Sequence, residues 1–228
     1  MVATPVGRTL DDTGDPIAGT GFEVDPHGTL AEKLRERTGP LVSNPVSREW
    51  VAELVPPEET DGEFHSALYL SAGEGPPKHY HVGYEETFEV FAGELTVVVD
   101  GTPTRVSAGD SHTVPAGAVH KPRYDGDDFA AAVGTVRPPG NTLELIMTTF
   151  GLTHEGKVRD SGHPSFLQGM VMTDGFADDT VFVSPPPAVT QPLATVLSPV
   201  GRLLGYRPTY SKYEQPEFWE RHVEQPDL

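Results

Sequence analysis

The chain has 228 residues, a length that suits one all-β domain with extensions. It contains no cysteine, which excludes a disulfide scaffold and a thiolate zinc site and leaves histidine and carboxylates as the strong metal ligands. The formal net charge of −18 argues against nucleic acids and anionic membranes as partners, because like charges repel.

The first 45 residues are predicted to form an N-terminal extension with one short helix. The stretch "TLAEKLRERTG", residues 29–39, carries the helix signals. Thr29 is expected to cap the helix start, with Glu32 completing a capping box, and Gly39 is expected to end the helix.

Residues 46–150 read as a series of short strands, each bounded by Gly, Pro or Asp. The dipeptide Asp100-Gly101 between "ELTVVV" and "TPTRV" predicts a tight hairpin. The segment "TLELIMTTFG", residues 142–151, is predicted to be the last strand. Closely spaced strands of this kind predict an all-β sandwich or barrel.

Residues 151–228 are predicted to form a C-terminal extension. Residues 167–172 fit either a helix or a strand, and His154 and His222 lie in polar or terminal segments where we expect exposure to solvent. Further on, apolar residues recur at helical spacing, which predicts an amphipathic helix, bent at Pro199, that packs this face on the barrel. These apolar residues are Leu193, Val196, Leu197, Val200, Leu203 and Leu204.

The stretch "GEGPPKHYHVGYEETFEVFAG", residues 73–93, groups histidines and glutamates in an order that a solvated loop would not need. Alternate residues of a strand face the same side, so His79 and His81 are expected to point together. Glu86 alternates with apolar residues and is expected to point inward with them. Glu85 is then expected to face solvent.

A second segment, "GDSHTVPAGAVHKPRY" at residues 109–124, places His120 on a later strand. If the two segments pair, His120 meets His79, His81 and Glu86. Three neutral imidazoles and one carboxylate suit a divalent first-row metal, and they would be costly to bury without one. We therefore predict that these four residues bind one divalent transition metal, either Fe, Mn, Ni, Cu or Zn.

Together the two segments resemble the two motifs of the cupin superfamily. The first reads G-x5-H-x-H-x4-E-x6-G from Gly73 to Gly93, and the second reads G-x5-P-x-G-x2-H from Gly109 to His120. The resemblance implies a double-stranded β-helix, a jelly-roll-like barrel, over residues 46–150, with the three histidines and the glutamate as metal ligands. It also implies a homodimer. The second motif departs from the family pattern at Tyr124, where an asparagine that is not normally a ligand is usual.

Glu86, His112 and Tyr124 are the candidate catalytic residues. Glu86 could serve as a ligand and also accept a proton. His112 is predicted to be either a proton-transfer residue at the pocket or a buried, hydrogen-bonded imidazole, and Tyr124 is expected to add a hydroxyl beside His120. Lys78 and Arg123 either attract an anionic substrate or are solvated edge residues.

Four protein ligands leave two octahedral positions for water, substrate or O2. The resemblance to cupins implies a metal-dependent enzyme of dioxygenase type that acts on a small organic molecule. One alternative is a sugar or sugar-phosphate isomerase or epimerase, which would need Lys78 or Arg123 as its phosphate contact. Another is a non-catalytic cupin that binds a small molecule. The fold alone does not decide between these functions.

The chain start shows no apolar run typical of a signal peptide, and no apolar stretch is long enough to span a membrane. We therefore expect a cytoplasmic protein without a membrane partner. Its acidic residues are scattered along the chain rather than gathered in one tail. This pattern indicates adaptation to high salt in a halophile, and the alternative is an ordinary acidic cytosolic surface.

Overall fold

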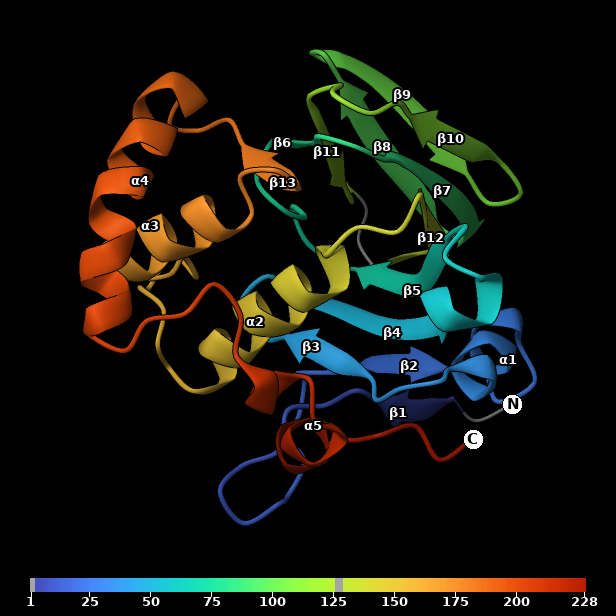
Figure 1. Ribbon diagram of the computed structural model, residues 1–228. Helices are drawn as coiled ribbons and strands as arrows, with labels where there is room; N and C mark the ends of the chain where they lie inside the picture. The colour runs from blue at the N-terminus through green and yellow to red at the C-terminus, as the bar shows by residue number, and fades with distance from the viewer. Residues whose placement is uncertain (1–2, 126–128) are drawn as a thin grey trace.

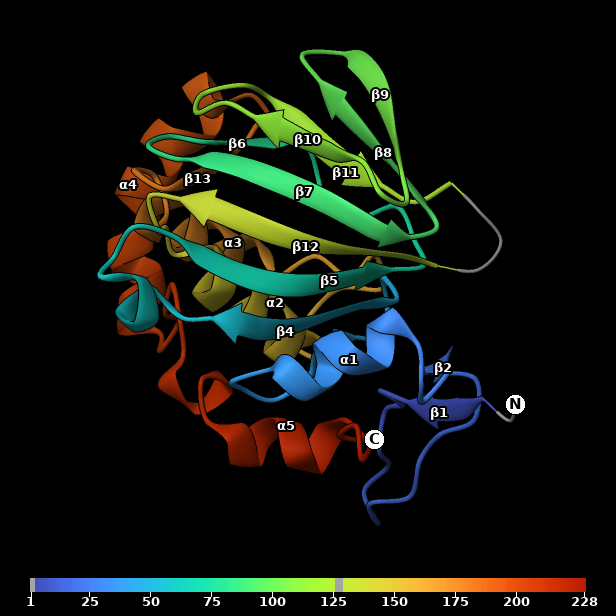
Figure 2. The same cartoon turned by 90° about the vertical axis from the view of Figure 1, so that its right-hand side faces the viewer.

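The computed structural model describes residues 3–125 and 129–228, and these form two main antiparallel β-sheets with helices packed around them (Figure 1). The six-stranded sheet has the order β10 (Ser111–Val114), β7 (Glu85–Ala92), β12 (Ala130–Arg137), β5 (His65–Ser71), β4 (Glu49–Val55) and β3 (Val42–Asn44). The five-stranded sheet has the order β13 (Thr180–Phe182), β6 (His79–His81), β11 (His120–Arg123), β8 (Glu94–Val99) and β9 (Thr102–Ser107). Figure 2 shows the broad face of the six-stranded sheet, with the other sheet behind its upper part.

The predicted hairpin is confirmed. Strands β8 and β9 pair from Glu94 opposite Ser107 to Val99 opposite Thr102. The two turn residues have positive φ angles, 48° at Asp100 and 85° at Gly101, as a type I′ turn requires.

The two sheets pack their apolar faces against each other. One cluster of buried side chains joins strands of both sheets; it contains Phe88, Val90, Leu95, Val97, Val106, Val114, Ala130 and Ala132. On β7 the buried residues alternate with exposed ones, so Glu86 points inward while Glu85 and Glu89 face solvent. The predicted facing of Glu85 and Glu86 is therefore confirmed.

The N-terminal residues form a small two-stranded sheet of β1 (Thr4–Val6) and β2 (Phe22–Val24), followed by α1 (Thr29–Glu36). The helix was predicted, but its capping was wrong. Gly28 is the N-cap and makes no side-chain capping bond, so Thr29 is the first helical residue and the Thr29–Glu32 capping box is absent. The helix ends at Arg37 as C-cap, two residues before Gly39.

The predicted last strand at residues 142–151 is wrong, because this segment is the helix α2 (Thr142–His154). The alternation of Thr, Leu, Glu and Leu covers only its first four residues, whereas the helix is thirteen residues long. Leu145, Phe150 and Leu152 are buried in a cluster with Trp219 of α5 (Pro216–His222). Burial on several sides of α2 outweighs its weak local preference for a strand.

The C-terminal segment continues with α3 (Phe166–Gly175), β13 and α4 (Pro187–Leu203), and the short 3-10 helices are η1 (Pro57–Thr60) and η2 (Ser211–Tyr213). Helix α4 packs on α3 through small residues, and a Cβ at Gly201 would lie 2.5 Å from Val171 Cγ2. The expectation that the apolar face of α4 packs on the barrel is wrong. Val196 is 70% exposed and Leu203 is 89% exposed. The face is exposed because small residues give α4 a closer contact with α3 on its other side.

Segments near the two ends of the chain meet beside α5. Arg8 Nε donates a hydrogen bond of 2.7 Å to Glu224 Oε2, and Thr9 forms an isolated antiparallel bridge with Val223. The expected exposure of His154 is wrong, since its Nε2 lies 2.9 Å from the carbonyl oxygen of Ser43 and the ring is half-buried. Within residues 3–125 and 129–228, no helix is long and apolar enough to cross a membrane.

Candidate metal centre

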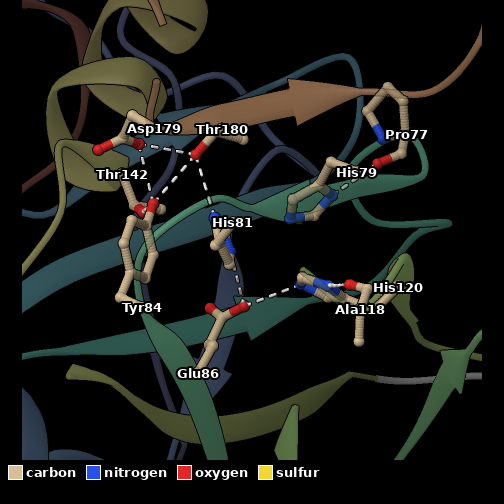
Figure 3. Close-up of polar contacts among 10 residues, drawn as sticks. All are labelled: Pro77, His79, His81, Tyr84, Glu86, Ala118, His120, Thr142, Asp179 and Thr180. Carbon is tan, nitrogen blue, oxygen red and sulfur yellow. Dashed lines mark hydrogen bonds and ion pairs between the residues drawn. The ribbon is translucent and has the colours of Figure 1, made fainter. Parts of the chain in front are cut away.

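The four predicted metal-ligating side chains come together between the two sheets (Figure 3). His79 and His81 lie on β6, and His120 on the neighbouring strand β11 stands directly opposite His79. Glu86 lies on β7 of the other sheet. Three imidazoles of one sheet thus face one carboxylate of the other.

The donor atoms of the four residues all lie within 4.8 Å of one another. Glu86 Oε2 is 3.2 Å from His81 Nε2 and 3.1 Å from His120 Nε2. All four residues are buried, and none is more than 7% exposed. A divalent cation placed among these atoms would be reached by three nitrogens and one carboxylate oxygen.

Hydrogen bonds on the outer side of each ring fix which nitrogen faces the centre. Nδ1 of His79 lies 2.8 Å from the carbonyl oxygen of Pro77, and Nδ1 of His120 lies 3.1 Å from that of Ala118. A carbonyl oxygen only accepts, so both rings carry a proton on Nδ1 and turn the Nε2 lone pair toward the centre in their neutral forms. Nδ1 of His81 makes the corresponding contact with Thr180 Oγ1 at 3.1 Å. This arrangement of lone pairs fits a metal ion.

Burial and the neighbouring charges set the protonation states. Burial, together with the neighbouring His120 and His81, lowers the pKa of His79 to about 3, so this ring is neutral at physiological pH. Burial favours the protonated form of Glu86. When Nε2 of His120 and of His81 is also protonated, these rings donate hydrogen bonds to the carboxylate, which outweigh burial and hold its pKa far below its usual range. Burial also opposes charge on His120, where the contact with Glu86 prevails and raises the pKa.

Tyr84 and two residues from the C-terminal segment, Asp179 and Thr180, lie on the side of His81 that faces away from Glu86. The Tyr84 ring stacks on His81 with a centroid distance of 4.4 Å. Its hydroxyl donates to Asp179 Oδ1 at 2.9 Å and lies 3.0 Å from Thr180 Oγ1. Asp179 and Thr180 were not predicted from the sequence. They lie more than 90 residues beyond His81, and no spacing rule connects the two segments.

His112 and Tyr124 are not in the group of four. His112 on β10 stands opposite Phe88, facing the interior and half-buried, while its neighbour on the same face, Val114, stands opposite Glu86. Tyr124 follows the end of β11 and packs against the apolar cluster between the sheets. Their catalytic roles stay predictions.

The other charged candidates lie outside the cluster as well. Lys78 is exposed, and Arg123 is exposed and pairs with Asp125 at 3.1 Å. His65 is buried, with its Nε2 3.2 Å from Glu53 Oε1.

Tyr69 is a further residue near Glu86 that no sequence pattern predicts for the site. It lies on the inner face of β5, opposite Ala132 of β12. Its ring crosses Gly134, where an added Cβ would lie 2.4 Å from Tyr69 Cε2. Burial raises the pKa of the Tyr69 phenol well above its ordinary value, and the charge of Glu86 raises it further. The hydroxyl therefore keeps its proton at neutral pH.

The structure is thus a β-sandwich-like fold of two facing antiparallel sheets. Three histidines and one glutamate lie between the sheets, close enough together to bind one metal ion. Comparison with known families identifies this fold. Residues 68–136 match the family described as Cupin domain, and this segment of the chain is a cupin domain. The match contains all four clustered residues, whereas α2 to α5 and β13 lie beyond it.

Similarity to individual proteins is partial. The chain is 32% identical over 106 residues to quercetin 2,3-dioxygenase of Bacillus subtilis, which covers 44% of this chain and 29% of that protein. It is 29% identical over 150 residues to the probable oxidoreductase patJ of Aspergillus clavatus, covering 61% of this chain and 46% of that protein. The matched regions thus span less than half the length of these two relatives. Among solved structures, a predicted oxalate decarboxylase from Thermotoga maritima matches with a TM-score of 0.39 and 21% identity over 46% of this chain and 96% of that one.

Proposed function

We propose that this chain binds one divalent transition metal and acts as a metal-dependent enzyme of dioxygenase type on a small organic molecule. The observation that carries the proposal is the convergence of histidine nitrogens on the Glu86 carboxylate in a buried site. The similarity to a quercetin dioxygenase and to a probable oxidoreductase, each over part of its length, supports the same chemistry. The identity of the metal stays open among Fe, Mn, Ni, Cu and Zn.

The residues that would hold the metal are His79, His81 and His120 through Nε2, and Glu86 through its carboxylate. A bound metal would act as a Lewis acid and offer its remaining positions to O2 and to an oxygen atom of the substrate. The fixed Nδ1–H bonds of the histidines would keep these donors oriented without further rearrangement.

Glu86 is the residue best placed to move a proton. Its carboxyl group is ionised at neutral pH, which is the state that a proton acceptor needs, and because so low a pKa makes it a weak base, the substrate hydroxyl would first have to be acidified by the bound metal. Its Oε2 faces His81 and His120, which leaves Oε1 for that role. Tyr69 keeps its proton and could donate a hydrogen bond to an oxygen of the substrate.

The side chains beside the donor cluster are apolar, so we propose an apolar or aromatic substrate. Phe88, Val90 and Val97 pack in the buried cluster between the sheets, and the alternation on β7 places Phe88 on the same face as Glu86. Burial of this kind keeps bulk water away from the reacting atoms.

A sugar-phosphate isomerase is supported less well. That reaction needs a cation for the phosphate group, and the two candidates are exposed residues, of which Arg123 already pairs with Asp125. A non-catalytic role in binding a small molecule is the third alternative.

Oxygen uptake separates these functions. The protein would be loaded in turn with Fe(II), Mn(II) and Ni(II) and mixed with a flavonol, a catechol, an enediol or a β-diketone in an oxygen electrode. We expect substrate-dependent O2 uptake that is lost in Glu86→Gln and retained in Glu85→Gln, the exposed neighbour on the same strand. Conversion of a sugar phosphate without O2 uptake would favour the isomerase. Saturable binding with no turnover of any of these compounds would favour the binding function.

A further inference from the structure

Strand β13 brings the C-terminal segment to the back of the donor cluster. It pairs antiparallel with β6, placing Thr180 directly opposite His81 and Phe182 opposite His79. Backbone bonds hold this register on both sides, from Val82 N to the carbonyl oxygen of Asp179 and from Val183 N to that of Lys78. Because directly opposed residues share a face of the sheet, the Thr180 hydroxyl lies beside the His81 ring, as Figure 3 shows.

The direction of the hydrogen bonds from Thr180 follows from proton counting. Thr180 Oγ1 lies 2.8 Å from Asp179 Oδ1 and donates its single proton to this carboxylate, which only accepts. Toward His81 Nδ1, at 3.1 Å, the same hydroxyl can therefore act only as an acceptor. His81 must then carry its proton on Nδ1, and its Nε2 lone pair faces Glu86 in the neutral ring.

The Asp179 carboxylate is itself fixed by other donors. Its Oδ1 also accepts from the Tyr84 hydroxyl at 2.9 Å, and its Oδ2 accepts from the backbone N and the Nδ2 of Asn141 at 2.8 Å and 3.1 Å. Asp179 is 9% exposed and Thr180 is 5% exposed. A buried carboxylate with four donors cannot rotate. The direction of the hydrogen bonds that link His81 to Thr180 and Thr180 to Asp179 is therefore fixed.

We propose that Thr180 and Asp179 are positioning residues of the metal centre, which orient His81 and fix its donor nitrogen. His79 and His120 obtain the same control from carbonyl oxygens of their own loops, whereas His81 depends on β13. The cupin segment at residues 68–136 therefore contributes the ligands, and a strand more than 40 residues beyond it completes their support. This inference rests on the proposed metal binding.

The test compares Thr180→Val, which keeps the shape of the side chain and removes the hydroxyl, with Thr180→Ser, which keeps the hydroxyl. The control is Thr87→Val, which removes a hydroxyl bonded to Thr113 one residue from Glu86, on the opposite face of the strand. Affinity for Co(II) would be measured by calorimetry on the full chain. Loss of a group that supports a ligand weakens metal binding by about 10- to 100-fold, so we expect this loss in Thr180→Val, near wild-type affinity in Thr180→Ser and no change in Thr87→Val.

A spectroscopic measurement separates positioning from a general loss of structure. In the Zn(II)-loaded protein, each metal-bound histidine should show an Nδ1–H proton signal. In Thr180→Val we expect the signal of His81 to move upfield or exchange away, while those of His79 and His120 stay in place. Asp179→Asn provides a second variant if Thr180→Val does not fold, and it should weaken Co(II) binding in the same direction.

Wild-type affinity for Co(II) in Thr180→Val and Asp179→Asn, with an unchanged His81 signal, would overturn the inference while leaving the metal site intact. Failure of the wild-type protein to bind Co(II) or Zn(II) would instead overturn the proposed metal function, and this inference with it.

Discussion

Replacing Gly140 by alanine tests how tightly the support of the metal centre is packed. A Cβ at this position would lie 2.1 Å from Tyr84 Cε1 and 2.4 Å from its Cζ. Carbon atoms in contact prefer about 3.5–4.0 Å, so the ring would have to move by about 1.5 Å. The φ angle of Gly140 is not in the left-handed region, so the steric contact alone decides the effect.

The displacement of Tyr84 should be costly because this side chain is 4% exposed and hydrogen-bonded at its tip. Overpacking a core costs about 1–3 kcal/mol. Loss of a hydrogen bond to a charged group such as Asp179 adds about 1.5–3 kcal/mol. We expect the free energy of unfolding to fall by about 3 kcal/mol. For a chain of this length this loss corresponds to a decrease in Tm of roughly 6–12 °C.

Because the Tyr84 ring stacks on His81, metal affinity should fall as well, by about 10-fold or more. Urea unfolding and Co(II) titration would measure the two effects. The matched control is Gly83→Ala, where an added Cβ meets no atom within 4 Å and only a small change is expected. Wild-type stability and affinity in Gly140→Ala would refute the reasoning that Gly140 makes room for Tyr84.

Three further predictions concern other parts of the chain. Burial lowers the pKa of His154 from 6.5 to about 4, so its contribution to stability is complete above pH 6.5 and is lost as the pH falls toward 4. Urea unfolding would measure the free energy of unfolding of the wild type and of His154→Gln across this pH window. The slope of this free energy against pH should be about 1.4 kcal/mol per pH unit less steep in the variant, and equal slopes in the two proteins would contradict the prediction. If the acidic surface is adapted to high salt, Tm should rise from about 0.1 M to molar KCl as screening relieves repulsion, and a flat curve would contradict it. Gly101→Ala should lower the free energy of unfolding by about 1–2 kcal/mol, since its φ of 85° disfavours a side chain; an unchanged urea midpoint would argue against the tight turn.

The sequence was sufficient to predict the donor cluster because two local rules agree there. The period of two along a strand places His79 and His81 on one side and distinguishes Glu86 from Glu85, and the cupin motifs add His120. The hairpin at Asp100-Gly101 was predictable for a similar reason, since positive φ angles favour few residue types.

The predictions that were wrong or absent concern features that depend on contacts between distant segments of the chain. The alternation of the first residues of α2 predicts a strand, whereas tertiary packing against α5 decides that the segment is a helix. The apolar face of α4 was expected to be buried, but the small residues Ala194, Ser198 and Gly201 make the contact with α3 instead. The role of Thr180 follows from the pairing of β13 with β6, and no local sequence pattern predicts this pairing.

The most direct test of the account is the metal content of protein purified without added metal and without a histidine tag, measured by elemental mass spectrometry. The account predicts about one equivalent of a divalent first-row metal per chain. This metal should be lost in His79→Ala and Glu86→Ala. It should be retained in the controls Glu85→Ala and His163→Ala, because Glu85 and His163 are exposed residues outside the cluster. A folded wild-type protein that contains no such metal, and takes none up when Fe(II), Mn(II), Ni(II), Cu(II) or Zn(II) is supplied, would contradict it.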